Sequence, residues 1–202
     1  MSGIDRHALS QTATFNHMKQ HKRLNALFDQ CEREFRCAFA QTKADHAAIR
    51  RRLAIGEVLE PYCGLYARTV YWHRLSPPEQ CTHVIRALAI KHPTWVFAGI
   101  HSAIAHGFAV SYSALRDKRI CIVSTTQTHN HDHAALQRVY MPTVPTTTIN
   151  GLRVRSPTRT LLDCARMLPF QQALPVFDSA AQTIDCNLHY HCPNHYASIR
   201  LV

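Results

Sequence analysis

Three consecutive arginines, at positions 50–52, form the longest run of cationic side chains in the sequence. Asp45 can cap a helix that carries them, and Gly56 is a natural end for it. Ile49 and Leu53 lie one turn apart and can face inward, so we expect the arginines to fan outward. Guanidinium groups on such a helix can contact DNA phosphates while one reaches a guanine edge. The run predicts a recognition helix, and the alternative is a charged helix face that is only solvated.

A hairpin is expected directly behind this helix. Residues 57–68 form two short apolar and aromatic segments about a turn that contains Pro61 and Gly64. A helix over about residues 15–37 and a short second helix over 36–42 precede the arginines. Helix, helix, basic helix and hairpin follow the order of a winged helix-turn-helix. The residues that we expect to contact double-stranded DNA are Lys43, Arg50, Arg51, Arg52, Tyr62 and Arg68.

A second cluster of chemically able residues is the Ser-Pro-Thr-Arg-Thr-Leu-Leu-Asp segment at positions 156–163. Ser156 can cap a helix whose first position suits the proline, and Asp163 could pair with Arg159 or Arg166 at one-turn spacing. We favour this structural interpretation. The functional alternative keeps Arg159 as a contact to an anion or a partner. The residues of this signature are Ser156, Arg159, Thr160 and Asp163.

Two groups of histidine and cysteine residues are candidate ligands for a metal ion. One places three histidines at alternating positions, and the other has zinc-type ligands at short spacing. The loop between the ligand pairs of the second group is far shorter than in usual zinc modules, so we expect no metal and no cofactor. The two groups are His129, His131 and His133, and Cys186, His189, Cys192 and His195.

The sequence offers little for catalysis. It contains no G-x-S-x-G, no P-loop and no H-E-x-x-H. Residues 91–202 hold only five acidic side chains, so acid and base chemistry would have to rely on histidine. We expect a protein that is not an enzyme, and a histidine-dependent or zinc-dependent enzyme is the alternative.

The composition of the chain indicates which kinds of partner it can bind. The chain has 202 residues, 46% of them hydrophobic, and a formal net charge of +10. This charge favours nucleic acid over membrane as a partner. No apolar run has the length of a membrane span and the first twenty residues do not resemble a signal peptide, so a cytoplasmic location is expected.

The second half alternates between strand and helix patterns. Two helices close it, over residues 157–167 and 170–183, and we expect an α/β (α+β) region. The expected strands are 95–98, 119–124, 136–141, 146–149 and 152–154, and the further expected helices are 79–92 and 102–106. The apolar residues expected to face the core from the closing helices are Leu161, Leu162, Ala165, Leu168, Leu174, Phe177 and Ala180.

This pattern divides the chain into four parts. Residues 1–19 are a leader without a clear period, and residues 20–75 are the expected winged helix-turn-helix. Residues 79–183 are the expected α/β domain with its two closing helices. Residues 184–202 are a tail without a core-forming period.

Several segments resemble the AbiEi-type antitoxins and regulators. The turn Cys-Gly-Leu-Tyr-Ala at 63–67 resembles the wing of that family, and His-Ser-Ala-Ile-Ala-His-Gly-Phe at 101–108 resembles its short helix. The segment at 154–163 is similar to the family signature, and the resemblance covers about residues 40–182. It implies a DNA-binding transcriptional regulator that represses its own operon, as the antitoxin of a type IV toxin-antitoxin system that opposes a nucleotidyltransferase toxin.

The sequence departs from that family at two places. The wing carries Glu57 and Glu60 where relatives are commonly basic. No acidic residue follows Asp185, so the paired carboxylates of the nuclease domain that many relatives carry are missing. A truncated relative of the nuclease-bearing branch, acting only as a DNA-binding remnant, is therefore a further alternative.

Overall fold

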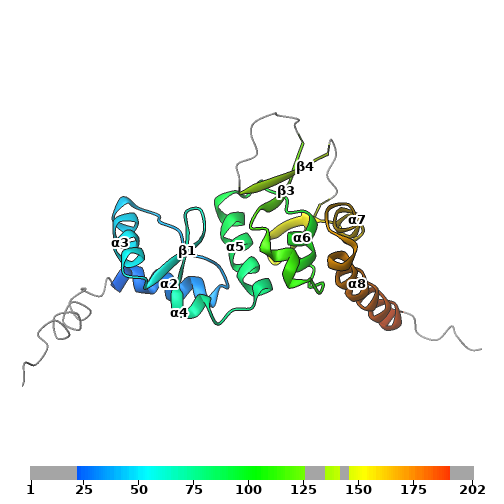
Figure 1. Ribbon diagram of the computed structural model, residues 1–202, viewed down its shortest axis with the longest axis horizontal. Coiled ribbons are helices and arrows are strands. Elements are labelled where there is room, and N and C mark those ends of the chain that lie inside the picture. Colours follow the sequence, from blue (N-terminus) through cyan, green and yellow to red (C-terminus); the bar gives the residue numbers. More distant parts are fainter. Residues whose placement is uncertain (1–21, 126–134, 142–145, 192–202) are drawn as a thin grey trace, which may run out of the picture.

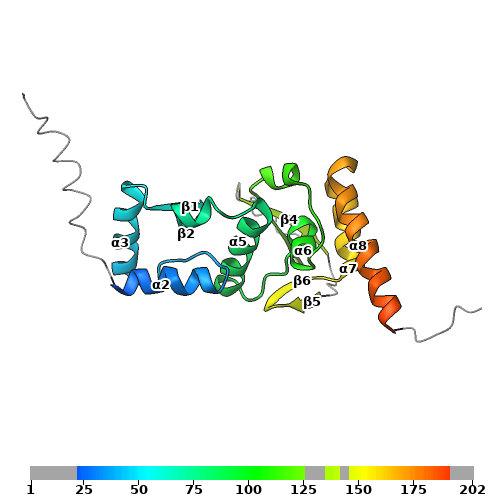
Figure 2. The same cartoon turned by 90° about the horizontal axis from the view of Figure 1, so that it is seen from below.

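The computed structural model describes residues 22–125, 135–141 and 146–191, with side chains up to Thr183. Seven α-helices and three pairs of strands lie within these residues, so the fold is mixed α/β. Figures 1 and 2 show an elongated arrangement in which α3 lies at one end, α7 and α8 lie at the other, and α5 stands between them.

The N-terminal part is built from two helices and a hairpin. Helix α2 is Lys22–Arg33 and helix α3 is Lys43–Ala54. Strand β1, Val58–Tyr62, pairs antiparallel with β2, Leu65–Arg68. Their apolar faces form one core cluster because each element buries a stripe of side chains. This cluster consists of Leu24, Phe28, Cys31, Ala38, Ala48, Ile49, Val58 and Tyr66.

The prediction of a short helix over residues 36–42 is wrong. The chain turns at Phe35, which has a φ of 51°, and then runs extended. Ala38 forms an isolated antiparallel bridge with Tyr66, and each residue's N–H donates to the other's carbonyl oxygen at 2.8 Å. The segment therefore adds a third extended chain to the hairpin, since pairing with a strand satisfies backbone groups that a helix would have used internally.

Helix α5, Pro77–Lys91, joins the two halves of the molecule. It starts with a capping box in which the Ser76 N–H donates to the Glu79 carboxylate at 2.7 Å, so the helix expected over 79–92 is confirmed with a start two residues earlier. A four-residue helix, α4 at Thr69–Trp72, precedes it. The core cluster around α5 draws on both halves, and it includes Leu65, Val84, Ile85, Leu88, Phe97, Ile122 and Val154.

The second half holds a mixed sheet around Phe97. Strand β3, Ile120–Ser124, is parallel to β4, Leu136–Tyr140, while β5, Thr146–Ile149, is antiparallel to β6, Leu152–Arg155. Phe97 bridges to β3 on one side and to β6 on the other. The strand expected over residues 95–98 is thus reduced to one bridging residue that joins the two pairs.

Helices cover this sheet and close the chain. Helix α6 is Gly99–Ala105, which starts three residues before the helix expected over 102–106, and an unexpected 3-10 helix spans Tyr112–Arg116. Helix α7 is Pro157–Met167 and has the bounds expected from the sequence. Helix α8, Phe170–His191, continues past the expected end at 183, so the first part of the expected tail is helical. Its inner face packs against α6 and α7 through a cluster of Ala103, Phe108, Cys164, Val176 and Ala180.

The expected inner faces of α7 and α8 are only partly correct. Ala180 is buried, but Leu162 is 47% exposed and Leu174 is 43% exposed, and Ala165 is also exposed. Leu161 packs against the cluster between α6, α7 and α8, whereas its neighbour Leu162 faces away from that cluster. Helical spacing identifies an apolar face, but the width of the covering elements decides how much of that face is buried.

Candidate nucleic-acid interface

The N-cap of helix α3 is Thr42 and not Asp45. Thr42 is the N-cap residue, and its hydroxyl accepts from the Asp45 N–H at 3.1 Å. The Asp45 carboxylate in turn accepts from the Thr42 N–H at 3.0 Å. Burial raises the pKa of Asp45, but the bonds from Thr42 and the charge of Arg23 outweigh it and leave this pKa below its usual value. The expected capping role of Asp45 is thus corrected to the reciprocal position of a capping box.

One face of α3 is exposed and basic. Its residues recur at helical spacing, and the helix's only carboxylate, Asp45, is turned inward. Neither Arg50 nor Arg51 has an ion pair with another described residue. Three exposed alanines, Ala44, Ala47 and Ala54, leave the helix backbone open to close approach. The exposed face consists of Lys43, Ala44, His46, Ala47, Arg50, Arg51 and Ala54.

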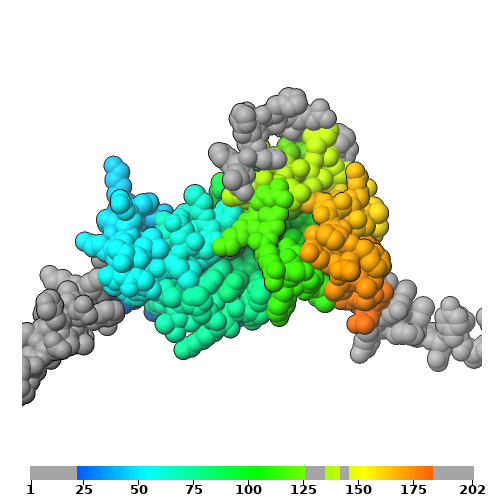
Figure 3. Space-filling model, viewed as in Figure 1, coloured from blue at the N-terminus to red at the C-terminus, as the bar shows by residue number. Residues whose placement is uncertain are grey.

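This face borders a shallow hollow at the start of the helix. The hollow has a volume of about 450 Å³ and includes Lys43, His46, Ala47 and Arg50, together with the extended segment just before α3. Figure 3 shows α3, in cyan, at one end of the molecule, and α7 and α8, in yellow and orange, at the other. The basic face is therefore at an extremity of the fold.

Arg52 does not belong to this face, and the expectation that it points outward is wrong. Its side chain is 5% exposed. One guanidinium nitrogen donates to the Asn25 side-chain oxygen at 2.6 Å and lies 3.3 Å from the Glu57 carboxylate. Three consecutive helical residues span most of a turn, so they cannot all face away from the body of the protein.

The two acidic residues of the hairpin have partners within the chain. Glu57 pairs with Arg52, and the Glu60 carboxylate accepts from the Gly64 N–H at 2.7 Å across the turn. Gly64 has a φ of 70°, a conformation that favours glycine. Both negative charges are thereby engaged in holding the hairpin.

The hairpin residues expected to contact DNA also have internal contacts. The Tyr62 hydroxyl donates to the Ala135 carbonyl at 2.9 Å and so connects the hairpin to the second half. Arg68 lies 2.7 Å from the carboxylate of Asp29 and 3.1 Å from that of Glu32. The structure therefore groups Lys43, Arg50 and Arg51 on one surface and places Tyr62 and Arg68 elsewhere.

The signature segment has mainly structural contacts. Ser156 occupies the N-cap position of α7 without a side-chain cap bond. The Thr160 hydroxyl lies 2.7 Å from that of Ser102 and donates to the Ser156 carbonyl at 2.9 Å. Asp163 pairs with Arg155 at 3.3 Å, which corrects the expected pairing with Arg159 or Arg166. Arg155 lies at the end of β6, a position that spacing along the helix could not reveal.

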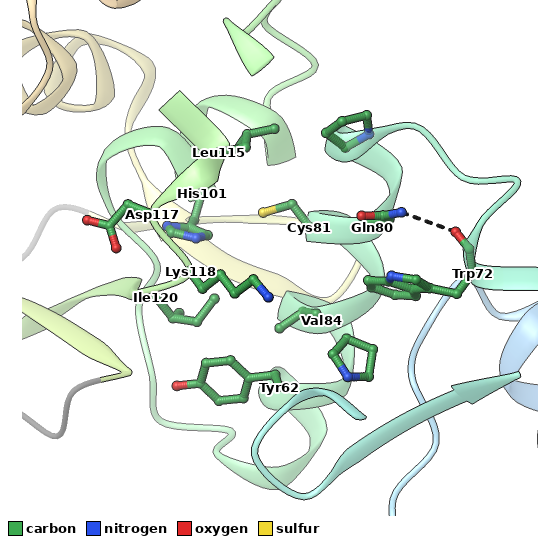
Figure 4. A pocket seen from close by; sticks show the side chains of 12 residues that line it. Tyr62, Trp72, Gln80, Cys81, Val84, His101, Leu115, Asp117, Lys118 and Ile120 are labelled. Carbon is green, nitrogen blue, oxygen red and sulfur yellow. Dashed lines mark hydrogen bonds between the residues drawn. The ribbon is translucent and has the colours of Figure 1, made fainter. Parts of the chain in front are cut away.

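A small pocket lies between the hairpin, α5 and the α6 region (Figure 4). It has a volume of about 160 Å³, and Cys81 and His101 both line it. Burial raises the pKa of the Cys81 thiol to about 12 and lowers that of His101 to about 4. Both groups are neutral near pH 7, so the pair does not generate a thiolate nucleophile.

The histidines and cysteines that were considered as metal ligands lie outside the described side chains. Within the described residues no group of three or more histidine, cysteine or acidic side chains is placed to hold a metal ion. In the same part of the chain, no helix combines the length and the apolar character needed to cross a membrane. These residues are His129, His131, His133, Cys186, His189, Cys192 and His195.

Sequence reasoning missed part of the basic face. His46 and Ala47 lie three and four residues before Arg50 and share its face, and this spacing was a signal that could have identified them. The Asn25 partner of Arg52 had no such signal, because it lies on another helix.

Comparison with protein-family models, with curated proteins and with solved structures found no match to this chain.

Proposed function

We propose that this protein binds double-stranded DNA through α3 and regulates transcription of its own operon. The observation that carries the proposal is the exposed face of α3, which holds Lys43, His46, Arg50 and Arg51 and no carboxylate. A helix that only faces solvent gains from charges of both signs, because opposite charges one turn apart attract each other. A face of one sign suits a polyanion.

The dimensions and place of α3 fit this role. An α-helix with side chains is about 10–12 Å across, and the major groove of B-DNA is about 12 Å wide. Arg50 and Arg51 can contact phosphates or base edges there, while Ala47 and Ala54 permit close approach. Helix α3 lies at an extremity of the molecule, so a duplex can reach it (Figures 1 and 2).

The hairpin serves as a support for α3 in this proposal, in the manner of a winged helix. Glu57 of the hairpin holds Arg52 of α3, and Ala38 pairs with Tyr66 of β2. Strong phosphate contact by the hairpin is not part of the proposal, because Arg68 is already paired with two carboxylates.

We further propose that the second half binds a protein partner, which the resemblance to AbiEi-type antitoxins suggests is a nucleotidyltransferase toxin. Exposed apolar side chains on α7 and α8 support this, namely Leu162 at 47%, Phe170 at 78% and Leu174 at 43% exposure. Phe170 and Leu174 lie one turn apart and form a contiguous apolar strip on α8, and contiguous apolar surface with an aromatic residue is typical of protein-binding sites.

Titration of DNA binding with salt tests the first proposal. Affinity for DNA from the protein's own promoter should fall with a log–log slope of about −0.9 per phosphate contacted. The double variant Arg50→Gln/Arg51→Gln should bind more weakly, and its slope should be shallower by about one unit for each arginine that contacts only phosphate.

The matched control is Arg116→Gln/Lys118→Gln. It removes the same charge from exposed residues outside α3 and should leave the slope unchanged. Equal weakening by both double variants would show that net charge, and not α3, determines binding, and the proposal would then be wrong.

A further inference from the structure

A groove lies between β4 and α7. Its volume is about 540 Å³, within the roughly 300–1,000 Å³ that is usual for sites of small ligands. Arg159 and Arg166 extend into it from α7, while β4 contributes Arg138 and Tyr140. Helix residues seven apart lie on one face, so both α7 arginines border the same space.

The charges in and behind the groove are predominantly positive. No described carboxylate lies within ion-pair distance of Arg159 or Arg166. The acidic side chain of the lining, Asp163, is mostly buried and is paired from behind with Arg155. Arg155 is itself fully buried, and its three guanidinium nitrogens have no hydrogen-bond partner among the described residues.

These charges match a phosphate group. Arginine binds phosphate through several N–H donors in a fixed planar arrangement. Arg159 also reaches across the groove, with one guanidinium nitrogen 3.3 Å from the Met141 sulfur. A sulfur atom is a weak acceptor, so a phosphate oxygen can replace it as the partner of this nitrogen.

The groove has a second feature that a simple phosphate ion would not use. Tyr140 lines it and is 45% exposed. An exposed aromatic ring can stack on a nucleobase, and Gln137, also in the lining, offers an amide with both donors and an acceptor. The groove therefore combines a cationic part with an aromatic part.

We propose that this groove binds a nucleotide, with its phosphates on Arg159 and Arg166 and its base on Tyr140. The site is separate from the DNA-binding face, because α7 and α3 lie at opposite ends of the molecule (Figures 1 and 2). The inference does not depend on the proposed function.

Calorimetric titration of the full chain with ATP and with pyrophosphate tests the proposal. The parent should bind both. Arg159→Gln/Arg166→Gln should weaken binding of each by about tenfold per arginine, the usual effect of losing a hydrogen bond to a charged group. Tyr140→Leu should weaken ATP binding severalfold and leave pyrophosphate unchanged, because only ATP carries a base.

The matched control is Arg50→Gln/Arg51→Gln, which removes the same charge from α3 and should leave ATP binding intact. Circular dichroism should show that all variants fold. Absence of ATP binding by the parent at millimolar concentration would overturn the proposal, as would equal weakening by the two arginine pairs. Displacement of ATP by a short unphosphorylated single-stranded oligonucleotide at lower concentration would show a polymer site and overturn it as well.

Discussion

Arg155 at the end of β6 lies 3.3 Å from the carboxylate of Asp163 on α7, with its side chain wholly inside the protein. This pair fixes the signature helix to the sheet. The two charges compensate each other inside the protein, where either alone would be costly.

Replacing Asp163 should be strongly destabilising for this reason. Removal of one partner of a buried ion pair leaves an uncompensated charge, so Asp163→Ala should lower the free energy of unfolding by about 3–5 kcal/mol. Asp178→Ala, at an exposed position of α8, should change it by less than about 0.5 kcal/mol. Urea unfolding measures both, and similar values for the two variants would contradict the role of the pair.

His101 should make stability depend on pH. Burial lowers its pKa from 6.5 to about 4 in the folded protein, while the unfolded chain takes up the proton near pH 6.5. The contribution of His101 to the free energy of unfolding should therefore be constant above pH 6.5. It should fall by at most about 3 kcal/mol as the pH is lowered from 6.5 to 4.

The control for this pH dependence is His101→Asn, whose side-chain oxygen can still accept from the Cys121 N–H that His101 binds at 3.2 Å. Denaturant unfolding at pH 7 and pH 5 should show a smaller difference for the variant than for the parent. An unchanged difference would assign the titration to other groups.

Arg50 and Arg52 should behave in opposite ways although they are two positions apart. Arg52→Ala should destabilise the fold by about 1–3 kcal/mol, because it leaves the Asn25 oxygen and Glu57 without their partner. Arg50→Ala should change the free energy of unfolding by less than about 0.5 kcal/mol and should instead weaken DNA binding. Thermal unfolding beside DNA titration separates the two, and equal loss of stability would show that Arg50 is not on a free face.

Leu162 and Leu24 give a matched test of burial on helices. Leu24 is fully buried in α2, and Leu162 is 47% exposed on α7. Leu24→Ala should cost about 2–5 kcal/mol of unfolding free energy, whereas Leu162→Ala should cost under about 1 kcal/mol because little apolar contact is lost. A large loss at Leu162 would mean that a partner or a second copy already covers α7.

Local sequence patterns were sufficient to predict most of the helices and strands. Helix α7 has the expected bounds, since a proline at its first position and regular apolar spacing are local signals. The pairs β3 with β4 and β5 with β6 fall close to the expected strands. Helix α8 continues through a segment without a core-forming pattern, because a helix once formed can extend without burying a face.

The partners of charged side chains were decided only by the tertiary structure. The sequence by itself determined that positions 50–52 carry positive charge on a helix, and spacing along that helix indicated neighbours such as His46. Which arginine turns inward depended on Asn25 of α2 and Glu57 of the hairpin, and the partner of Asp163 came from β6. Helical periodicity relates residues one turn apart, but long-range contacts depend on how the elements pack.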